Sequence, residues 1–233
     1  MSLKLLSTGN PKLMKGEKQG YLSFILHLAP SILSGFNTCP MASNGCAAAC
    51  LNTAGRGGMF KRGENTNAIQ EARIRKTRQF FNDREVFMSQ LVKDITLAIK
   101  QADRKGMIPV FRLNGTSDIR WETVAVGGFR NVMEMFPNVT FYDYTKLPNR
   151  RNIPANYHLT FSRSESNEHL IPSDLNVAVV FDKLPTTYLG RPVVNGDDTD
   201  LRFLDPQGVV VGLKAKGKAK KDNSGFTVIT GAK

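Results

Sequence analysis

Six short apolar segments, separated by polar stretches, constrain the fold of this chain most strongly. They cover residues 21–28, 108–113, 139–144, 157–162, 176–181 and 208–213. Each is nearly continuous in apolar side chains and ends in polar ones, which is typical of buried strands in a parallel sheet. The stretches between them leave room for helices or short turns. The sequence therefore predicts an α/β fold, an incomplete or irregular (β/α) barrel of about six mostly parallel strands.

Two helices are predicted between the first two of these segments, over residues 65–84 and 84–105. In the second, Phe87, Leu91 and Ile95 form an apolar stripe at helical spacing. No G-x-G-x-x-G pattern follows the first strand, which argues against a dinucleotide-binding sheet. No linker divides the 233 residues, so we expect a single domain over 1–233.

The composition limits the environment and the partners. No apolar run is long enough to cross a bilayer, and the first ten residues lack the pattern of a signal peptide. We therefore expect a cytoplasmic protein with no membrane partner. The formal net charge is +12 and the pI is about 9.8, which favours an anionic partner such as a nucleic acid or nucleotide. A basic surface that serves only solubility is the alternative.

The three cysteines, Cys39, Cys46 and Cys50, lie in one loop that spans residues 29–63. Their spacing is C-x6-C-x3-C. Cys46 and Cys50 share one side of a helical turn, and the turn signal Asn44-Gly45 can fold Cys39 back towards them. The three thiols are therefore predicted to converge on one metal site.

Thiolates select soft ions, so the candidates are a [4Fe–4S] cluster and zinc. A cluster held by three cysteines would leave one iron open to a substrate or cofactor. Zinc would want a fourth protein ligand, which His27 could supply. Unmetallated, buried thiols remain the plain structural alternative.

Polar side chains gather where the predicted strands end, which is the reactive edge of α/β barrels. We expect one polar cavity that faces the cysteine loop, although capping of the following helices would also explain these residues. The candidate catalytic residues are Asp118, Asp143 and Glu165. The candidate cofactor-binding residues are Asn114, Ser117, Asp118, Ser162 and Ser164.

Two basic stretches suit contacts to phosphates, which need cations but no fixed order. The lysine-rich segment 214–233 is expected to be a flexible loop or tail. Neither stretch has the interleaved aromatic residues of a single-strand stacking platform, and a solvated surface is the alternative. The candidate nucleic-acid-binding or anion-binding residues are Arg56, Arg73, Arg75, Lys76, Arg78, Lys214, Lys216 and Lys218.

Over nearly its full length the chain resembles a phage family known as gene product 88. The resemblance rests on the segments LLSTGNPKLMKGEKQGYLSFILHLAP, FNTCPMASNGCAAACLNTAGRG, RLNGTSDIRWE, FYDYTK, HLTFSRSESNE and GLKAKGKAKKD. It implies a phage origin and carries no mechanism with it.

A three-cysteine loop directly after a first strand also resembles the radical S-adenosylmethionine enzymes, whose usual spacing is C-x3-C-x2-C. This looser resemblance implies a [4Fe–4S] cluster on Cys39, Cys46 and Cys50, with S-adenosylmethionine at the open iron. The resulting prediction is a phage iron–sulfur enzyme in the cytoplasm of the infected host, acting on a nucleic acid or nucleotide. The alternative is a non-catalytic phage nucleic-acid-binding protein with a structural zinc or Fe–S site.

Overall fold

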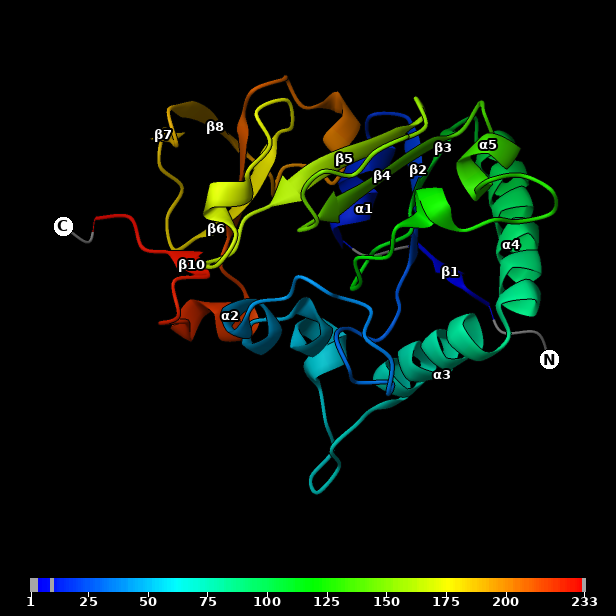
Figure 1. Cartoon of the computed structure of the whole chain (residues 1–233), viewed down its shortest axis with the longest axis horizontal. Coiled ribbons are helices and arrows are strands. Elements are labelled where there is room, and N and C mark those ends of the chain that lie inside the picture. Colours follow the sequence, from blue (N-terminus) through cyan, green and yellow to red (C-terminus); the bar gives the residue numbers. More distant parts are fainter. Residues whose placement is uncertain (1–3, 9–10, 232–233) are drawn as a thin grey trace.

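A mostly parallel sheet forms the centre of the molecule (Figure 1). The computed structural model describes residues 4–8 and 11–231. Its strands run in the order β1-β2-β3-β4-β5-β6-β9-β8-β7, and β10 pairs with β6. Only the β1–β2 and β7–β8 pairs are antiparallel within this described sheet. The strands are β1 (Leu6–Ser7), β2 (Tyr21–Leu26), β3 (Ile108–Arg112), β4 (Thr140–Thr145), β5 (Tyr157–Ser162), β6 (Val177–Phe181), β7 (Thr187–Tyr188), β8 (Arg191–Asn195), β9 (Val210–Lys214) and β10 (Thr227–Val228).

The α/β class with a mostly parallel sheet is confirmed. Each of the six predicted apolar segments overlaps a strand, namely β2, β3, β4, β5, β6 and β9. The barrel of about six strands is not confirmed, because the described sheet has ten strands and its outer strands β1 and β7 do not pair with each other. Three of the additional strands have only two residues, and β8 contains Pro192. Such segments carry little strand signal in a sequence.

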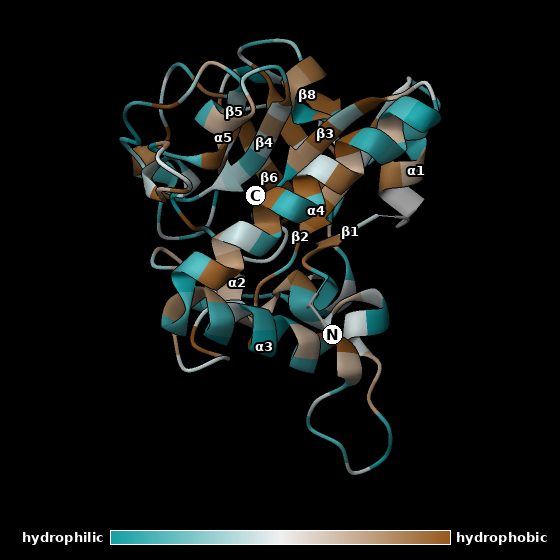
Figure 2. Cartoon of the chain, turned by 90° about the vertical axis from the view of Figure 1, so that its right-hand side faces the viewer, coloured by the Kyte–Doolittle hydropathy of each residue, from teal (hydrophilic) through white to brown (hydrophobic). Residues whose placement is uncertain are grey.

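Two long helices cover one face of the sheet at β2, β3 and β4. They are α3 (Ala68–Asn82) and α4 (Arg84–Arg104), close to the predicted ranges. Phe87, Leu91 and Ile95 of α4 are fully buried and pack with Phe24 of β2 and Phe111 of β3. Figure 2 shows α4 lying across the hydrophobic strands. Burial of each such side chain stabilises the fold by roughly 1.5–3 kcal/mol, so this face forms the main core.

The opposite face of the sheet is covered differently. Near the amino ends of the strands, Tyr142 of β4 and Val110 of β3 pack with Leu201. Phe203, in the 3-10 helix η5 (Arg202–Leu204), lies edge-on to Tyr21 at 5.4 Å. This cover does not extend over the carboxyl ends of the strands.

The carboxyl ends are covered by two segments distant in sequence, the cysteine loop 29–63 and residues 214–231. The loop contains α2 (Asn44–Ala48) and the 3-10 helices η1 (Leu51–Thr53) and η2 (Gly55–Gly58). Residues 214–231 contain the 3-10 helix η6 (Gly217–Lys221) and β10. Figure 1 shows α2 beside this C-terminal segment. The remaining helices of the described chain are α1 (Pro11–Glu17), α5 (Val132–Met135) and the 3-10 helices η3 (Trp121–Thr123) and η4 (Glu168–Leu170).

Residues 214–231 of the lysine-rich segment contain η6 and β10, two elements that the expected loop or tail did not include. The buried Ala219 packs with Ala49 and Phe226, and β10 adds a short strand to β6. Lysines that alternate with small residues carry little helix or strand signal, although Ala219 is buried and Ala215 is partly buried here. In the described part of the chain, no helix is long and apolar enough to cross a membrane.

Candidate functional site

A cavity of about 370 Å³ lies at the carboxyl ends of the central parallel strands. Neighbouring parallel strands place register partners on the same face, as in the pairs Ile25–Arg112 and Val180–Leu213. One inward side chain from near the end of each of six strands lines the cavity. These are Ile25 (β2), Arg112 (β3), Tyr144 (β4), Ser162 (β5), Val180 (β6) and Leu213 (β9).

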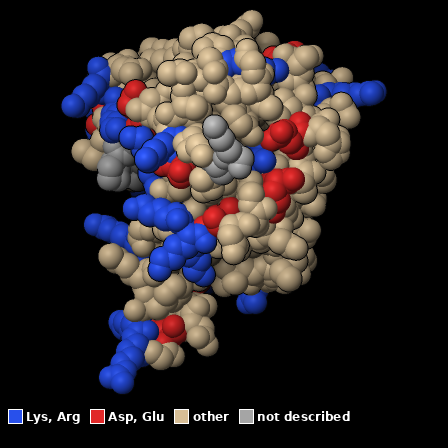
Figure 3. Space-filling model, turned by 90° about the vertical axis from the view of Figure 1, so that its left-hand side faces the viewer, with Lys and Arg blue, Asp and Glu red and all other residues tan. Residues whose placement is uncertain are grey.

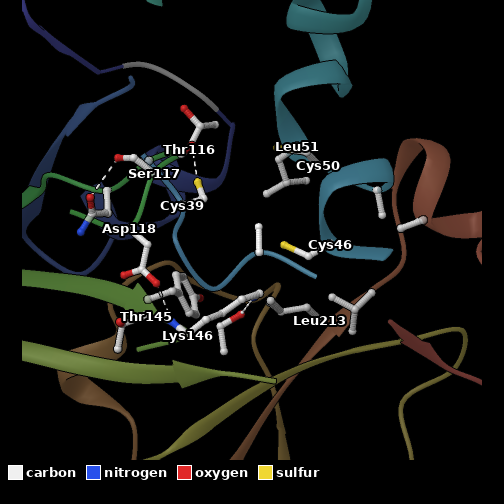
Figure 4. A pocket seen from close by; sticks show the side chains of 18 of the residues that line it. Cys39, Cys46, Cys50, Leu51, Thr116, Ser117, Asp118, Thr145, Lys146 and Leu213 are labelled. Atoms are coloured by element: carbon white, nitrogen blue, oxygen red, sulfur yellow. Dashed lines mark hydrogen bonds between the residues drawn. The ribbon is translucent and has the colours of Figure 1, made fainter. Parts of the chain in front are cut away.

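All three cysteines line this cavity from the opposite side. Figure 4 shows Cys39 and Cys46 pointing into the same space from different parts of the loop. Thr38 fixes the start of the loop, because its hydroxyl donates to the carbonyl of Ala29 at 2.7 Å. Ser43 caps α2 and accepts a hydrogen bond from the Cys46 amide at 3.1 Å. The loop thus brings the three thiols to the lining of one cavity.

The thiols lie close enough to influence one another electrostatically. Burial raises the pKa of the Cys50 thiol to about 11, and neighbouring Cys46 and Cys39 add to the rise. Burial also raises the pKa of Cys39, where Asp118 contributes. Among the residues that the structure describes, no three His, Cys, Asp or Glu side chains form a ready-made metal-binding group. The thiols therefore share a cavity, but they are not already arranged as a set of ligands.

Glu165, a predicted catalytic residue, holds the cysteine loop in place. Its two carboxylate oxygens accept hydrogen bonds from the Ser43 hydroxyl and the Gly45 amide, both at 2.8 Å. A side chain at position 45 would clash with the Ser224 hydroxyl group, so glycine allows this close approach. Glu165 is not among the residues that line the cavity. Its observed contacts are those of a positioning residue.

Asp143, another predicted catalytic residue, is fully buried on the helix-covered side of β4 and does not line the cavity. Its carboxylate accepts hydrogen bonds from the Asn114 amide at 2.7 Å and the Tyr157 hydroxyl at 2.8 Å. Burial raises the pKa of Asp143 to about 7, against the opposing effects of Arg112 and these donors. Strand alternation explains the placement. The side chains of Tyr142 and Tyr144 lie on the cavity face of β4, so that of Asp143, between them, lies on the helix-covered face.

Asp118 is the predicted catalytic residue that does line the cavity (Figure 4). One carboxylate oxygen, Oδ2, accepts a hydrogen bond from the Lys146 amide at 2.7 Å. The other, Oδ1, is buried and has no hydrogen-bond partner in the described part of the chain. Burial raises the pKa of this carboxyl group. A buried acceptor without a partner is costly, so Asp118 is suited to receive a donor from a ligand.

The turn that carries Asp118 is held by Asn114. The Asn114 side-chain oxygen accepts hydrogen bonds from the Ser117 hydroxyl and the Ile119 amide, both at 2.9 Å. Gly115 packs against β2, where a side chain would approach Ile25 to 2.6 Å. Asn114 and Ser117 both line the cavity, as does the predicted Ser162. Ser164 is fully buried and does not line it.

Several cations also line the cavity, namely Arg73, Arg112, Lys146, Lys214 and Lys216. Arg112 is paired with Asp200 at 3.1 Å, and Lys216 is paired with Asp197 at 2.6 Å. The Lys146 ammonium donates to the Ser162 hydroxyl at 2.5 Å. The cavity lining therefore combines several cations with the Asp118 carboxylate, one oxygen of which lacks a hydrogen-bond partner in the described part of the chain.

His27 lines the same cavity near Arg73 and Arg112. Burial, with smaller contributions from Arg73 and Arg112, lowers the pKa of His27 to about 3. The imidazole is therefore neutral at pH 7, which is the form that ligates a metal.

The other predicted anion-binding residues lie outside the cavity. Arg56, Arg75 and Lys218 are exposed. Lys76 donates to the Leu5 carbonyl at 2.7 Å, and Arg78 donates to the Ser34 carbonyl at 3.2 Å, so both hold loops. Sequence reasoning gave no role to Asp197 and Asp200, which come from a loop distant in sequence. The acidic run at residues 197–200 is the sequence feature that could have pointed to these two residues.

A family model described as Gene product 88 matches residues 4–228. No curated protein and no solved structure gives a significant match to the chain. The match covers nearly the whole sequence and confirms the resemblance noted from its motifs. The chain belongs to the Gene product 88 family.

Proposed function

We propose that this protein is an iron–sulfur enzyme that resembles the radical S-adenosylmethionine proteins and acts on a nucleic acid or nucleotide. The observation that carries the proposal is the position of Cys39, Cys46 and Cys50. All three line one cavity at the carboxyl ends of consecutive parallel strands. In α/β enzymes this edge is where reactive groups gather.

The donor set suits an iron–sulfur cluster in its chemistry. Three thiols select soft metal centres, and the neutral His27 lines the same cavity. The raised pKa values of Cys39 and Cys50 mean that binding must displace protons. Binding also requires the loop to draw the thiols closer together, since no ready-made ligand group exists in the described residues. A bound cluster would supply one-electron chemistry.

The rest of the cavity suits a ligand that carries both hydrogen-bond donors and negative charge. Asp118 Oδ1 can accept from a ribose hydroxyl or an amino group. Arg73, Lys146 and Lys214 line the same cavity and can hold a phosphate or carboxylate. A nucleotide carries these groups, and so does S-adenosylmethionine, apart from the phosphate. Cavity volume also agrees, because small-molecule sites span roughly 300–1,000 Å³.

The test compares two variants of α2 purified without oxygen. Cys46→Ala should lose the brown colour and the absorbance near ~400 nm that Fe–S proteins show. Ala47→Ser changes an exposed neighbour on the same helix and should keep both. An unchanged spectrum in Cys46→Ala would contradict the proposed ligand set. One zinc per chain in place of iron would instead favour a non-catalytic nucleic-acid-binding protein with a structural metal.

A further inference from the structure

A loop that projects from the molecule carries exposed apolar and basic side chains together. Residues 59–66, here termed the arm, extend away from the body between η2 and α3 (Figures 1 and 2). Met59 is 70% exposed and Phe60 is 42% exposed, and the next two residues are Lys61 and Arg62. Large apolar side chains that pack on no core are a feature of interaction sites.

The arm is anchored at its base by Asn67. The Asn67 side-chain amide donates to the carbonyls of Gly57 at 3.0 Å and Met59 at 2.9 Å. Within the arm, the Glu64 amide donates to the Lys61 carbonyl at 3.0 Å, which closes a turn. Lys61 and Glu64 form an exposed ion pair at 3.9 Å, and such pairs are weak in water. The arm therefore has a defined base, and the exposed Phe60 lies next to it in the chain.

A second basic element lies against η1, which precedes η2 and the arm in the chain. The 3-10 helix η6 contacts η1, which in turn contacts η2. Gly217 at the start of η6 lies against Ala54, which joins η1 to η2. Lys218, Lys220 and Lys221 are exposed on η6. Figure 3 shows Lys and Arg side chains gathered on the side that carries the projecting arm.

The C-terminal segment that contains η6 also borders the cavity, although no residue of the arm lines it. Leu51 of η1 lines it, and so do Lys216 and Ala219 from the C-terminal segment. A chain bound along η6 and the arm would therefore pass beside the thiol-lined cavity. A duplex is too wide to enter a cavity of about 370 Å³. One nucleotide of a single strand is small enough to enter it.

We propose that the arm and η6 bind a single-stranded nucleic acid, with Phe60 stacking on a base and the lysines contacting phosphates. Exposed aromatic rings bind bases whose faces are free, and cations hold the backbone. The strand would lead to the cavity, and this part of the inference rests on the proposed function. Phe60 was not apparent as a stacking residue in the sequence, because only the structure shows that its ring is exposed.

The test measures the binding of fluorescently labelled oligonucleotides, single-stranded and duplex, by anisotropy at low salt. Phe60→Ala should weaken single-strand binding at least about fivefold, since base stacking on an aromatic ring contributes roughly 1–3 kcal/mol. The matched control is Phe129→Ala, because Phe129 is 43% exposed and also precedes an arginine. This control should bind as the wild type does. The double variant Lys61→Ala/Arg62→Ala should lower the salt dependence of binding.

Equal single-strand affinity in Phe60→Ala and the wild type would overturn the inference, and so would tighter binding of duplex than of single strand. Iron content, measured on the same preparations, separates this result from the proposed function. Loss of binding in Phe60→Ala without iron in any preparation would support the arm and contradict the cluster. Iron in every preparation with no effect of Phe60→Ala would contradict the arm alone.

Discussion

The two faces of the sheet differ in chemistry although the same strands form both. On the helix-covered face, Phe111 of β3 stacks with Phe24 at 5.4 Å and lies 5.6 Å from Phe141. On the cavity face, the next residue, Arg112, pairs with Asp200 and lies over the ring of Tyr144. Alternation along one strand thus separates the residues that stabilise the fold from those that suit ligand binding.

The covers of the two faces differ in the same way. Helices α3 and α4 contribute large apolar side chains to one continuous core. The cysteine loop meets the C-terminal segment through a small cluster built on Ala49, Ala219 and Phe226. Few buried apolar contacts correspond to a low local free energy of opening. We therefore expect the cover over the cavity to open more easily than the helix-covered side.

The largest expected effect on stability comes from a substitution on the helix-covered face. Phe111→Ala should lower the free energy of unfolding by about 3–5 kcal/mol, because a fully buried aromatic side chain leaves a cavity. Chemical denaturation measures the change. Phe129→Ala, at an exposed position, should change stability by less than ~0.5 kcal/mol. Similar effects of the two substitutions would contradict the assigned core.

A pH-dependent effect is expected from Asp143 on the same face. Its pKa is raised to about 7 by burial, so the folded state keeps a proton that the unfolded state releases near pH 4. Stability from this group is present at low pH and is lost as the pH rises through 7. Relative to Asp143→Asn, the wild type should lose roughly 2–3 kcal/mol between pH 5 and pH 8. Denaturation curves at both pH values measure it, and a difference that is constant or of opposite sign would contradict it.

A smaller effect is expected where the cysteine loop meets the C-terminal segment. Gly45→Ala adds a methyl group 2.8 Å from both Glu165 and the Phe226 Cβ. It should cost about 1–3 kcal/mol, as overpacking does. It should also speed alkylation of Cys46 by iodoacetamide, because α2 must move. The exposed substitution Ala47→Ser is the control, and equal alkylation rates in the two variants would argue against this contact.

The smallest effect on stability is expected on the cavity face itself. Asp118→Asn retains an oxygen for the Lys146 amide and should change stability by less than ~1 kcal/mol. It removes the charge from a buried acceptor, so affinity for adenosine monophosphate or S-adenosylmethionine should fall about 10–100-fold. Isothermal titration calorimetry measures this. Ser117→Ala alters the cavity without removing charge and should have the weaker effect. An unchanged affinity in Asp118→Asn would show that Asp118 does not bind the ligand.

The sequence predicted the elements better than their assembly. Continuous apolar runs located six of the seven described strands that have five or more residues and missed β8, because the central residues of those six are largely buried. The open, ten-stranded arrangement depends on short edge strands such as β7 and β10, which have no pattern long enough to detect.

The candidate site was predicted only in part, because its arrangement also depends on the assembly of the strands. The strand ends suggested Asp118, Asp143 and Glu165, but they did not show which face each side chain takes. Asp118 lines the cavity, Asp143 faces the helices and Glu165 supports α2. Counting alternation from the paired inward positions would have separated Asp143 from Tyr144. Asp200 comes from a distant loop, and only the folded chain brings it to Arg112.

The most direct test of the account is the content of iron and acid-labile sulfide in the wild-type protein purified without oxygen. If Cys39, Cys46 and Cys50 hold a [4Fe–4S] cluster, we expect about four irons and four sulfides per chain. Iodoacetamide should then modify the three thiols only after the cluster is removed. Metal-free protein whose three thiols react at once, even after reconstitution with iron and sulfide, would contradict the account.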